Sequence, residues 1–198
     1  MRTQLNLWPG LAFVAVVLSW VAFVLTFLLH RKPPALPDKK RDPASIAGIV
    51  FQGLSYPPLW IIRRQWFTPP LGSSKFLEIT AAVLTILLAV ASVWLCRAAV
   101  RTLGVQWSLA ARVVEGHKLV TQGPYSIVRN PIYTGMFGML LATGLAVSHW
   151  IGLVLAVVMF AIGTVIRVHS EEKLLREMFA EEFDEYAQSV PAVIPFLI

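Results

Sequence analysis

Residues 130–166 read NPIYTGMFGMLLATGLAVSHWIGLVLAVVMFAIGTVI, and none of these 37 residues carries a formal charge. About 20 apolar helical residues cross a bilayer, so this stretch is nearly twice as long as one crossing. Polar residues in its middle, Ser148 and His149, interrupt the apolar run. The pattern predicts a tight helical hairpin that crosses a membrane twice.

Three further spans are predicted before this hairpin. The first covers residues 7–29, which is longer than a signal-peptide core and lacks a small-residue cleavage site. The second covers residues 43–62 and contains Pro57 and Pro58, which predict a kink or an early break. The third runs from about residue 76 to residue 99. With 57% apolar and 14% charged residues in 198, the composition excludes an ordinary soluble enzyme.

The distribution of basic residues predicts the orientation of these five spans. If the amino terminus lies outside, the cytoplasmic segments hold thirteen Lys and Arg residues and the external segments hold four. Basic residues accumulate on the cytoplasmic side, so we expect the amino terminus outside and the carboxyl terminus inside. The loop of residues 104–129 and everything after residue 166 would then face the cytoplasm. Topology also accounts for the net charge of +6, and no nucleic-acid partner is predicted.

The two predicted cytoplasmic segments carry the residues suited to chemistry. The loop reads GHKLVTQGPY over residues 116–125 and SIVRNPIY over residues 126–133. After the last span, Arg167 and Glu171 lie four residues apart and share a helix face. Taken alone, these features also allow a plain interfacial loop and a weak ion pair within one helix. No metal-ligand set is predicted.

Helical spacing of apolar side chains after residue 174 predicts an amphipathic helix that continues out of the membrane. Its apolar positions are Leu175, Met178, Phe179, Phe183 and Tyr186. Its wet side carries Glu181, Glu182, Asp184 and Glu185.

The carboxyl-terminal half holds, in order, the motifs GHKLV, GPY and RNPIY, a hydrophobic hairpin, R-x-x-x-E-E-x-x-L-x-x-x-F and a closing V-P-x-x-I-P. This set resembles the isoprenylcysteine carboxyl methyltransferase family, which is related to phospholipid methyltransferases. The resemblance covers about residues 103–195, whereas the first two spans resemble nothing that can be aligned. It implies an all-α, multi-pass membrane enzyme with about five spans and a carboxyl-terminal amphipathic helix. Residues 1–102 would hold the first three spans, and residues 103–198 the methyltransferase-like region of the same membrane domain.

The resemblance implies that a methyl group passes from S-adenosylmethionine to a lipophilic acceptor. The implied cofactor contacts are His117, Lys118, Leu119, Val120 and Tyr125 on the loop and Asn130, Pro131, Ile132 and Tyr133 at the head of the fourth span. Glu171 is similar to the carboxylate that holds the cofactor. Arg167 is similar to the arginine that faces the acidic group of the substrate, and it is the predicted catalytic and substrate-binding residue.

The chain departs from the family at residue 130. Members usually have Arg-His-Pro, whereas this chain has Asn130 between the Arg and the Pro. Asparagine forms hydrogen bonds but exchanges no proton near neutral pH. A carboxylate acceptor is already ionised at pH 7 and needs no general base, so we favour carboxyl O-methylation of an isoprenylcysteine-like acceptor. Ala180 and Phe183 replace a frequent Gly and Tyr, and we expect these to be packing changes.

Alternatives stay open at this point. A phospholipid amine, a fatty or isoprenoid acid or a small lipophilic molecule would use the same pocket. Membrane sterol reductases share a similar carboxyl-terminal architecture but use NADPH, and here Gly135 is followed by Met136 with no Asp or Glu nearby. A non-catalytic membrane scaffold would also tolerate Asn130. The expected partners are a lipophilic small molecule or prenylated acceptor and membrane lipids.

Overall fold

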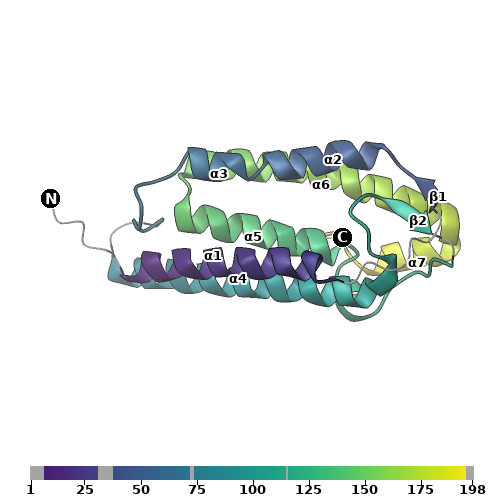
Figure 1. Cartoon of the computed structure of the whole chain (residues 1–198), viewed down its shortest axis with the longest axis horizontal. Coiled ribbons are helices and arrows are strands. Elements are labelled where there is room, and N and C mark those ends of the chain that lie inside the picture. Colours follow the sequence, from purple (N-terminus) through teal and green to yellow (C-terminus); the bar gives the residue numbers. More distant parts are fainter. Residues whose placement is uncertain (1–6, 31–37, 72–73, 115, 195–198) are drawn as a thin grey trace.

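The structure is a computed structural model of one chain, and its described part is mostly helical (Figure 1). The described residues are 7–30, 38–71, 74–114 and 116–194. Three basic residues of the topology count and the last residue of the closing motif lie outside these ranges, namely Arg2, Arg31, Lys32 and Pro195.

The predicted class, an all-α multi-pass membrane protein, is confirmed. Among the described residues, three helices are long and apolar enough to cross a membrane, and a further apolar helix has 17 residues. The long helices are α1 (Leu7–Leu28), α4 (Lys75–Leu103) and α6 (Trp150–Phe179), and the shorter one is α5 (Pro131–Val147).

The predicted hairpin is formed by α5 and α6. Pro131 is the first residue of α5, where its missing N–H needs no partner. The turn at the other end of α5 is closed by His149, whose Nδ1 accepts a hydrogen bond from the backbone N–H of Ile151 at 3.4 Å. The polar interruption in the sequence therefore marks the turn correctly.

The predicted second span is broken where its two prolines lie. Helix α2 (Ala44–Leu54) ends before them, and the short helix α3 (Pro57–Ile61) begins at Pro57. Neither Pro57 nor Pro58 has an N–H to donate to a preceding turn, so the helix restarts at this point. The predicted break is confirmed.

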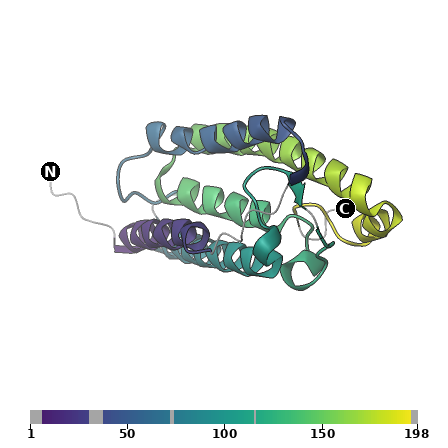
Figure 2. The same ribbon diagram turned by 45° about the vertical axis from the view of Figure 1, so that its right-hand side comes forward.

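The helices form three layers that run along the long axis of the molecule (Figures 1 and 2). Helices α2, α3 and α6 make one outer layer, α1 and α4 make the other, and α5 lies between them. Helix α5 packs closely because its interior positions are small. A Cβ atom at Gly135 would collide with Cys96, and one at Gly138 would collide with Ser92, both on α4. The backbone of α5 can therefore lie directly against side chains of α4.

At one end of the bundle the connections fold into a cap. Strand β1 (Asp38–Arg41) pairs antiparallel with β2 (Arg112–Val114), and the short 3-10 helices η1 (Gly104–Gln106) and η2 (Gly123–Ser126) lie in the loop on either side of β2. Helix α7 (Glu181–Ser189) lies at the same end (Figure 1). The sequence patterns predicted neither strand, because each is too short to show alternation.

The predicted amphipathic helix is not one continuous helix. Helix α6 continues from the apolar span to Phe179, and the chain then turns at Ala180, which has φ +45°. A residue with a Cβ atom rarely adopts a positive φ, and glycine does so without steric cost. The replacement of a frequent Gly by Ala180 therefore affects a turn of the backbone, and the expectation that it changes only packing is corrected. Arg176 and Asp184 span the turn with an ion pair of 2.7 Å.

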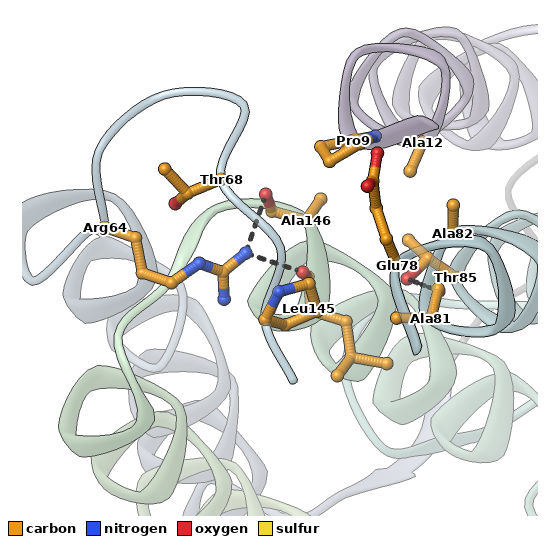
Figure 3. Close-up of a pocket in the computed structure, with 11 residues that line it drawn as sticks. Pro9, Ala12, Arg64, Thr68, Glu78, Ala81, Ala82, Thr85, Leu145 and Ala146 are labelled. Atoms are coloured by element: carbon orange, nitrogen blue, oxygen red, sulfur yellow. Dashed lines mark hydrogen bonds between the residues drawn. The ribbon is translucent and has the colours of Figure 1, made fainter. Parts of the chain in front are cut away.

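The opposite end of the bundle is closed by Arg64 (Figure 3). Its guanidinium donates hydrogen bonds to the backbone oxygens of Ser148 at 2.7 Å, Leu145 at 2.9 Å and Ala146 at 3.2 Å. These are carbonyls at the end of α5 that lack helical partners, and a cation there also complements the helix dipole. The cavity beside them has only about 10 Å³, which is the size of one water site.

Candidate active site

A cavity of about 930 Å³ lies at the capped end of the bundle. Residues from α1, α2, α4, α5, α6, α7 and the loop between α4 and α5 line it. This volume is at the upper end of the range for ligand pockets. The cavity therefore has room for a cofactor and part of a second molecule.

The walls of the cavity differ in chemistry. Its apolar residues lie mainly on the transmembrane helices and the start of the α4–α5 loop, and they include Phe23, Phe27, Leu28, Ile49, Leu103, Trp107 and Met136. Its Arg, Lys and Glu residues lie between α4 and α5 and on the second half of α6, namely Arg112, Lys118, Arg129, Arg167, Glu171 and Glu172, and two histidines, His30 and His117, also line it. Such a cavity suits a polar group that carries a lipophilic tail.

Arg167 lines the cavity from α6, and it is only 5% exposed. Its Nη1 donates to Oε1 of Gln52 at 3.2 Å, and its Nη2 donates to the backbone oxygen of Leu109 at 2.5 Å. Its guanidinium carbon is 4.7 Å from the centre of the Tyr133 ring. The Nε atom is buried and has no hydrogen-bond partner within the described part of the chain. A buried donor without a partner marks a place where a ligand acceptor would be satisfied.

Glu171 lies one helical turn beyond Arg167. The hydroxyl of Tyr133 donates a hydrogen bond to its Oε1, and Nη2 of Arg167 is 3.5 Å from the same oxygen. The side chain of Glu171 is still 30% exposed and lines the cavity. Glu171 therefore forms an ion pair with Arg167 within α6 and also lines the cavity.

Arg129 joins the loop before α5 to α6 through a largely buried ion pair and to the end of α7 through hydrogen bonds. Nη2 of Arg129 is 2.8 Å from Oε1 of Glu172, and the two side chains are 13% and 15% exposed. Arg129 also donates to the backbone oxygens of Ala187 and Val190. A bidentate guanidinium can join these groups at once, which lysine could not.

The side chain of Asn130 also holds the carboxyl-terminal segment. Its Nδ2 donates to the backbone oxygen of Ala192 at 3.0 Å, and its backbone N–H donates to the same oxygen at 2.9 Å. The next turn of α5 adds a hydrogen bond from Thr134 to the backbone oxygen of Val193 at 2.5 Å. Residues 190–194 therefore return to the head of α5.

Residues of the loop between α4 and α5, among them His117 and Tyr125, also line the cavity. His117 has a buried Nδ1 without a hydrogen-bond partner in the described ranges, and burial lowers the pKa of His117 below its ordinary value, which favours the neutral ring. Tyr125 is buried, and burial raises the pKa of its phenol above the usual range. Its backbone oxygen accepts a hydrogen bond of 2.6 Å from Tyr186 on α7, and burial raises the pKa of Tyr186 to about 12. Both phenols are neutral at physiological pH.

The structure brings the predicted site residues together around one cavity, with a single exception. Arg167, Glu171, His117, Lys118, Leu119, Val120, Tyr125, Asn130, Ile132 and Tyr133 line it. Pro131 does not line it and lies buried as the first residue of α5. The contact of Pro131 with the cofactor stays a prediction.

Several lining residues were missed from the sequence, among them Gln52, Trp107, Arg129, Glu172 and Tyr186. Gln52 had a usable signal, since it is an amide within an otherwise mostly apolar span, and polar residues in spans usually face the protein interior. The pairing of Arg129 with Glu172 left no signal in the sequence, because the two residues are 43 positions apart.

The fold and the cavity define a class: a multi-pass helical membrane protein with a ligand cavity at one end of its bundle. The sequence model of the phospholipid methyltransferase family matches residues 80–182, which is more than half of the chain. The chain belongs to this family.

Named relatives match over a similar region. Protein-S-isoprenylcysteine O-methyltransferase B of Arabidopsis thaliana is 35% identical over 83 residues, which cover 42% of each chain. Protein-S-isoprenylcysteine O-methyltransferase of Schizosaccharomyces pombe is 29% identical over 45% of this chain and 38% of its own. The nickel-cobalt-cadmium resistance protein NccN of Alcaligenes xylosoxydans xylosoxydans is 37% identical over 48% and 45%. The chain thus spans about two fifths of the length of these relatives.

Proposed function

We propose that this protein is an S-adenosylmethionine-dependent methyltransferase that O-methylates the carboxylate of a lipophilic, isoprenylcysteine-like acceptor. The observation that carries the proposal is Arg167, a buried arginine that lines the cavity and whose Nε has no hydrogen-bond partner in the described part of the chain. Family membership and the names of the relatives from Arabidopsis and Schizosaccharomyces support the reaction class.

The polar wall fits the methyl donor. When bound, S-adenosylmethionine supplies an electrophilic methyl group on a sulfonium cation. His117 would offer a neutral ring and an unpartnered Nδ1, so it adds no charge that repels this cation. Glu171 would offer a carboxylate oxygen to donor groups of the cofactor. The remaining contacts would come from Lys118, Leu119, Val120, Tyr125, Asn130, Ile132 and Tyr133.

Arg167 would bind and orient the acceptor. Its Nε–H suits a carboxylate oxygen, and the apolar wall that includes Phe27, Ile49 and Trp107 would hold the lipophilic tail. The cavity walls would shield the acceptor carboxylate from bulk water, which removes its hydration before the reaction. They would also hold the carboxylate close to the methyl group. The ionised carboxylate requires no base, and in this chain Asn130 supplies none.

The orientation follows from the same proposal. The capped end would lie in the cytoplasm, where the basic residues predict it and where the water-soluble cofactor is found. The hairpin turn at His149 and the loop that holds Arg64 would lie on the external side.

Transfer to defined acceptors tests this proposal. Purified, detergent-solubilised protein is incubated with methyl-labelled S-adenosylmethionine and an N-acetylated cysteine that carries an S-isoprenyl chain, and the matched control is the same compound with its carboxylate replaced by a carboxamide. We expect label in the carboxylate compound only, and mild base should release it, as expected for a methyl ester. Label found only in phosphatidylethanolamine vesicles, stable to base, would replace the carboxyl acceptor by an amine. Failure to bind the cofactor in calorimetry would refute the methyltransferase itself.

A further inference from the structure

Helix α2 contributes to the site although it lies outside the matched region of residues 80–182. Gln52 is the residue through which it does so. Its side chain is 1% exposed, lines the cavity and contacts α6. A primary amide is costly to bury in a membrane span unless both of its ends are paired.

Both ends of the Gln52 amide are paired with α6. Its Nε2 donates to Oγ1 of Thr164 at 2.9 Å, and its Oε1 accepts from Nη1 of Arg167 at 3.2 Å. The reverse orientation would place an NH₂ group against a guanidinium, which also has only donors. The hydrogen bonds therefore fix the amide with its oxygen toward Arg167.

The backbones of α2 and α6 leave this amide little freedom. A Cβ atom at Gly163 would lie 2.8 Å from the backbone nitrogen of Gln52, and one at Gly48 would lie 2.8 Å from the backbone oxygen of Gly163. Contacts below 3.0 Å do not occur for real Cβ atoms, so only glycine permits this approach. Helix α2 thus holds the amide at a fixed distance from Arg167.

Helix α2 also supports the opposite side of the guanidinium. The Oγ of Ser45 accepts a hydrogen bond of 3.1 Å from the backbone N–H of Ala111, two residues after the Leu109 carbonyl that binds Arg167. One contact of Nη1 and one contact of Nη2 are therefore tied to α2, and Nη2 also lies 3.5 Å from Oε1 of Glu171 on α6. The Tyr133 ring covers a face of the group. The buried Nε has no hydrogen-bond partner in the described ranges.

We propose that Gln52 is a positioning residue that sets the rotation of the Arg167 guanidinium, and thereby orients that group toward the carboxylate of the acceptor. The inference rests on the proposed function, in which Arg167 binds that group. A neutral amide holds the guanidinium without adding a second negative charge to that of Glu171, whereas a carboxylate at residue 52 would compete with the acceptor.

Two substitutions at residue 52 test this role. Gln52→Leu removes the hydrogen bond, and Gln52→Glu keeps the shape but adds a negative charge. We expect each to raise the acceptor KM about tenfold, the loss that follows from one hydrogen bond to a charged group. The Kd of S-adenosylmethionine in calorimetry should change by less than about twofold, since the cofactor contacts do not involve α2.

Thr143→Val is the matched control. Thr143 accepts a hydrogen bond of 3.0 Å from Nε1 of Trp20, which is also a buried polar contact between helices, but neither residue lines the cavity. We expect Thr143→Val to lower the thermal midpoint about as much as Gln52→Leu and to leave the acceptor KM unchanged. An unchanged KM in both Gln52 variants, or an equal rise in Thr143→Val, would overturn the positioning role.

Binding of the acceptor without turnover separates this inference from the proposed function. The probe is the S-isoprenyl, N-acetyl cysteine carboxylate, titrated into protein without cofactor. If the unmodified protein binds the probe but transfers no methyl group, the proposed reaction is wrong, and weaker binding to Gln52→Leu would still support the positioning role. If the unmodified protein does not bind the probe, both proposals fail.

Discussion

Replacement of Arg167 tests most directly whether the acceptor and the cofactor are bound by different residues. Arg167→Ala removes the guanidinium that we propose binds the acceptor, together with its positive charge. A hydrogen bond to a charged group contributes about 1.5–3 kcal/mol, so we expect kcat/KM for the carboxylate acceptor to fall by about 10- to 150-fold. Cofactor affinity should stay within about threefold, because Glu171 and the loop residues would hold that ligand.

Arg167→Lys separates charge from shape. A lysine keeps the positive charge, but its single ammonium cannot reach Gln52, the Leu109 oxygen and a ligand in the same planar arrangement. We expect a fall in kcat/KM between those of the unmodified protein and Arg167→Ala. Both variants are assayed for initial rates against acceptor concentration, with calorimetry for the cofactor and a thermal midpoint as the folding control. Full turnover by Arg167→Ala in folded protein would refute the assigned role.

Three further predictions concern other parts of the chain. Burial lowers the pKa of His117 in the folded protein, so below about pH 6.5 the unfolded chain binds a proton at this histidine more readily than the folded protein does. The stability contributed by the neutral ring is therefore present above that pH and is lost as the pH falls. Thermal midpoints from pH 8 to pH 5 should therefore drop more for the unmodified protein than for His117→Gln, and equal slopes would contradict this. Ala180→Gly should raise the thermal midpoint by about 2–4 °C, since glycine relieves about 1 kcal/mol of strain at φ +45°; a lower midpoint would argue against the strained turn. Gly138→Leu should cost about 1–3 kcal/mol because its side chain would collide with Ser92 on α4, and an unchanged midpoint in detergent would refute the close packing of α5.

The sequence predicted the spans because their signals are local. An uncharged run of 37 residues with a polar middle is enough to predict the α5–α6 hairpin, and the pair Pro57-Pro58 is enough to predict the break after α2. The turn at Ala180 was not predicted, since alanine normally favours the helix and the positive φ results from tertiary contacts. Strands β1 and β2 depend on each other across 70 residues and have no local signature.

The site was predicted in its carboxyl-terminal part and missed in its amino-terminal part. Motif order identified Arg167, Glu171 and the loop residues, because these positions resemble a known family. Nothing comparable exists for α1 and α2, yet Phe23 and Gln52 line the same cavity. Their position is set by packing of α1 on α4 and of α2 on α6, and packing partners cannot be deduced from apolar composition alone.

Asn130 links the sequence departure to the proposed chemistry. A base at this position would need a free side-chain nitrogen that faces the acceptor, but the Asn130 Nδ2 already donates to the Ala192 oxygen. Together with the Arg129 contacts to α7, this hydrogen bond fixes the carboxyl-terminal segment at the head of α5. The side chain at residue 130 therefore has a structural use that asparagine satisfies without exchanging a proton. A carboxylate acceptor is the substrate class for which this loss of a titratable group carries no catalytic cost, because its nucleophilic oxygen is already ionised.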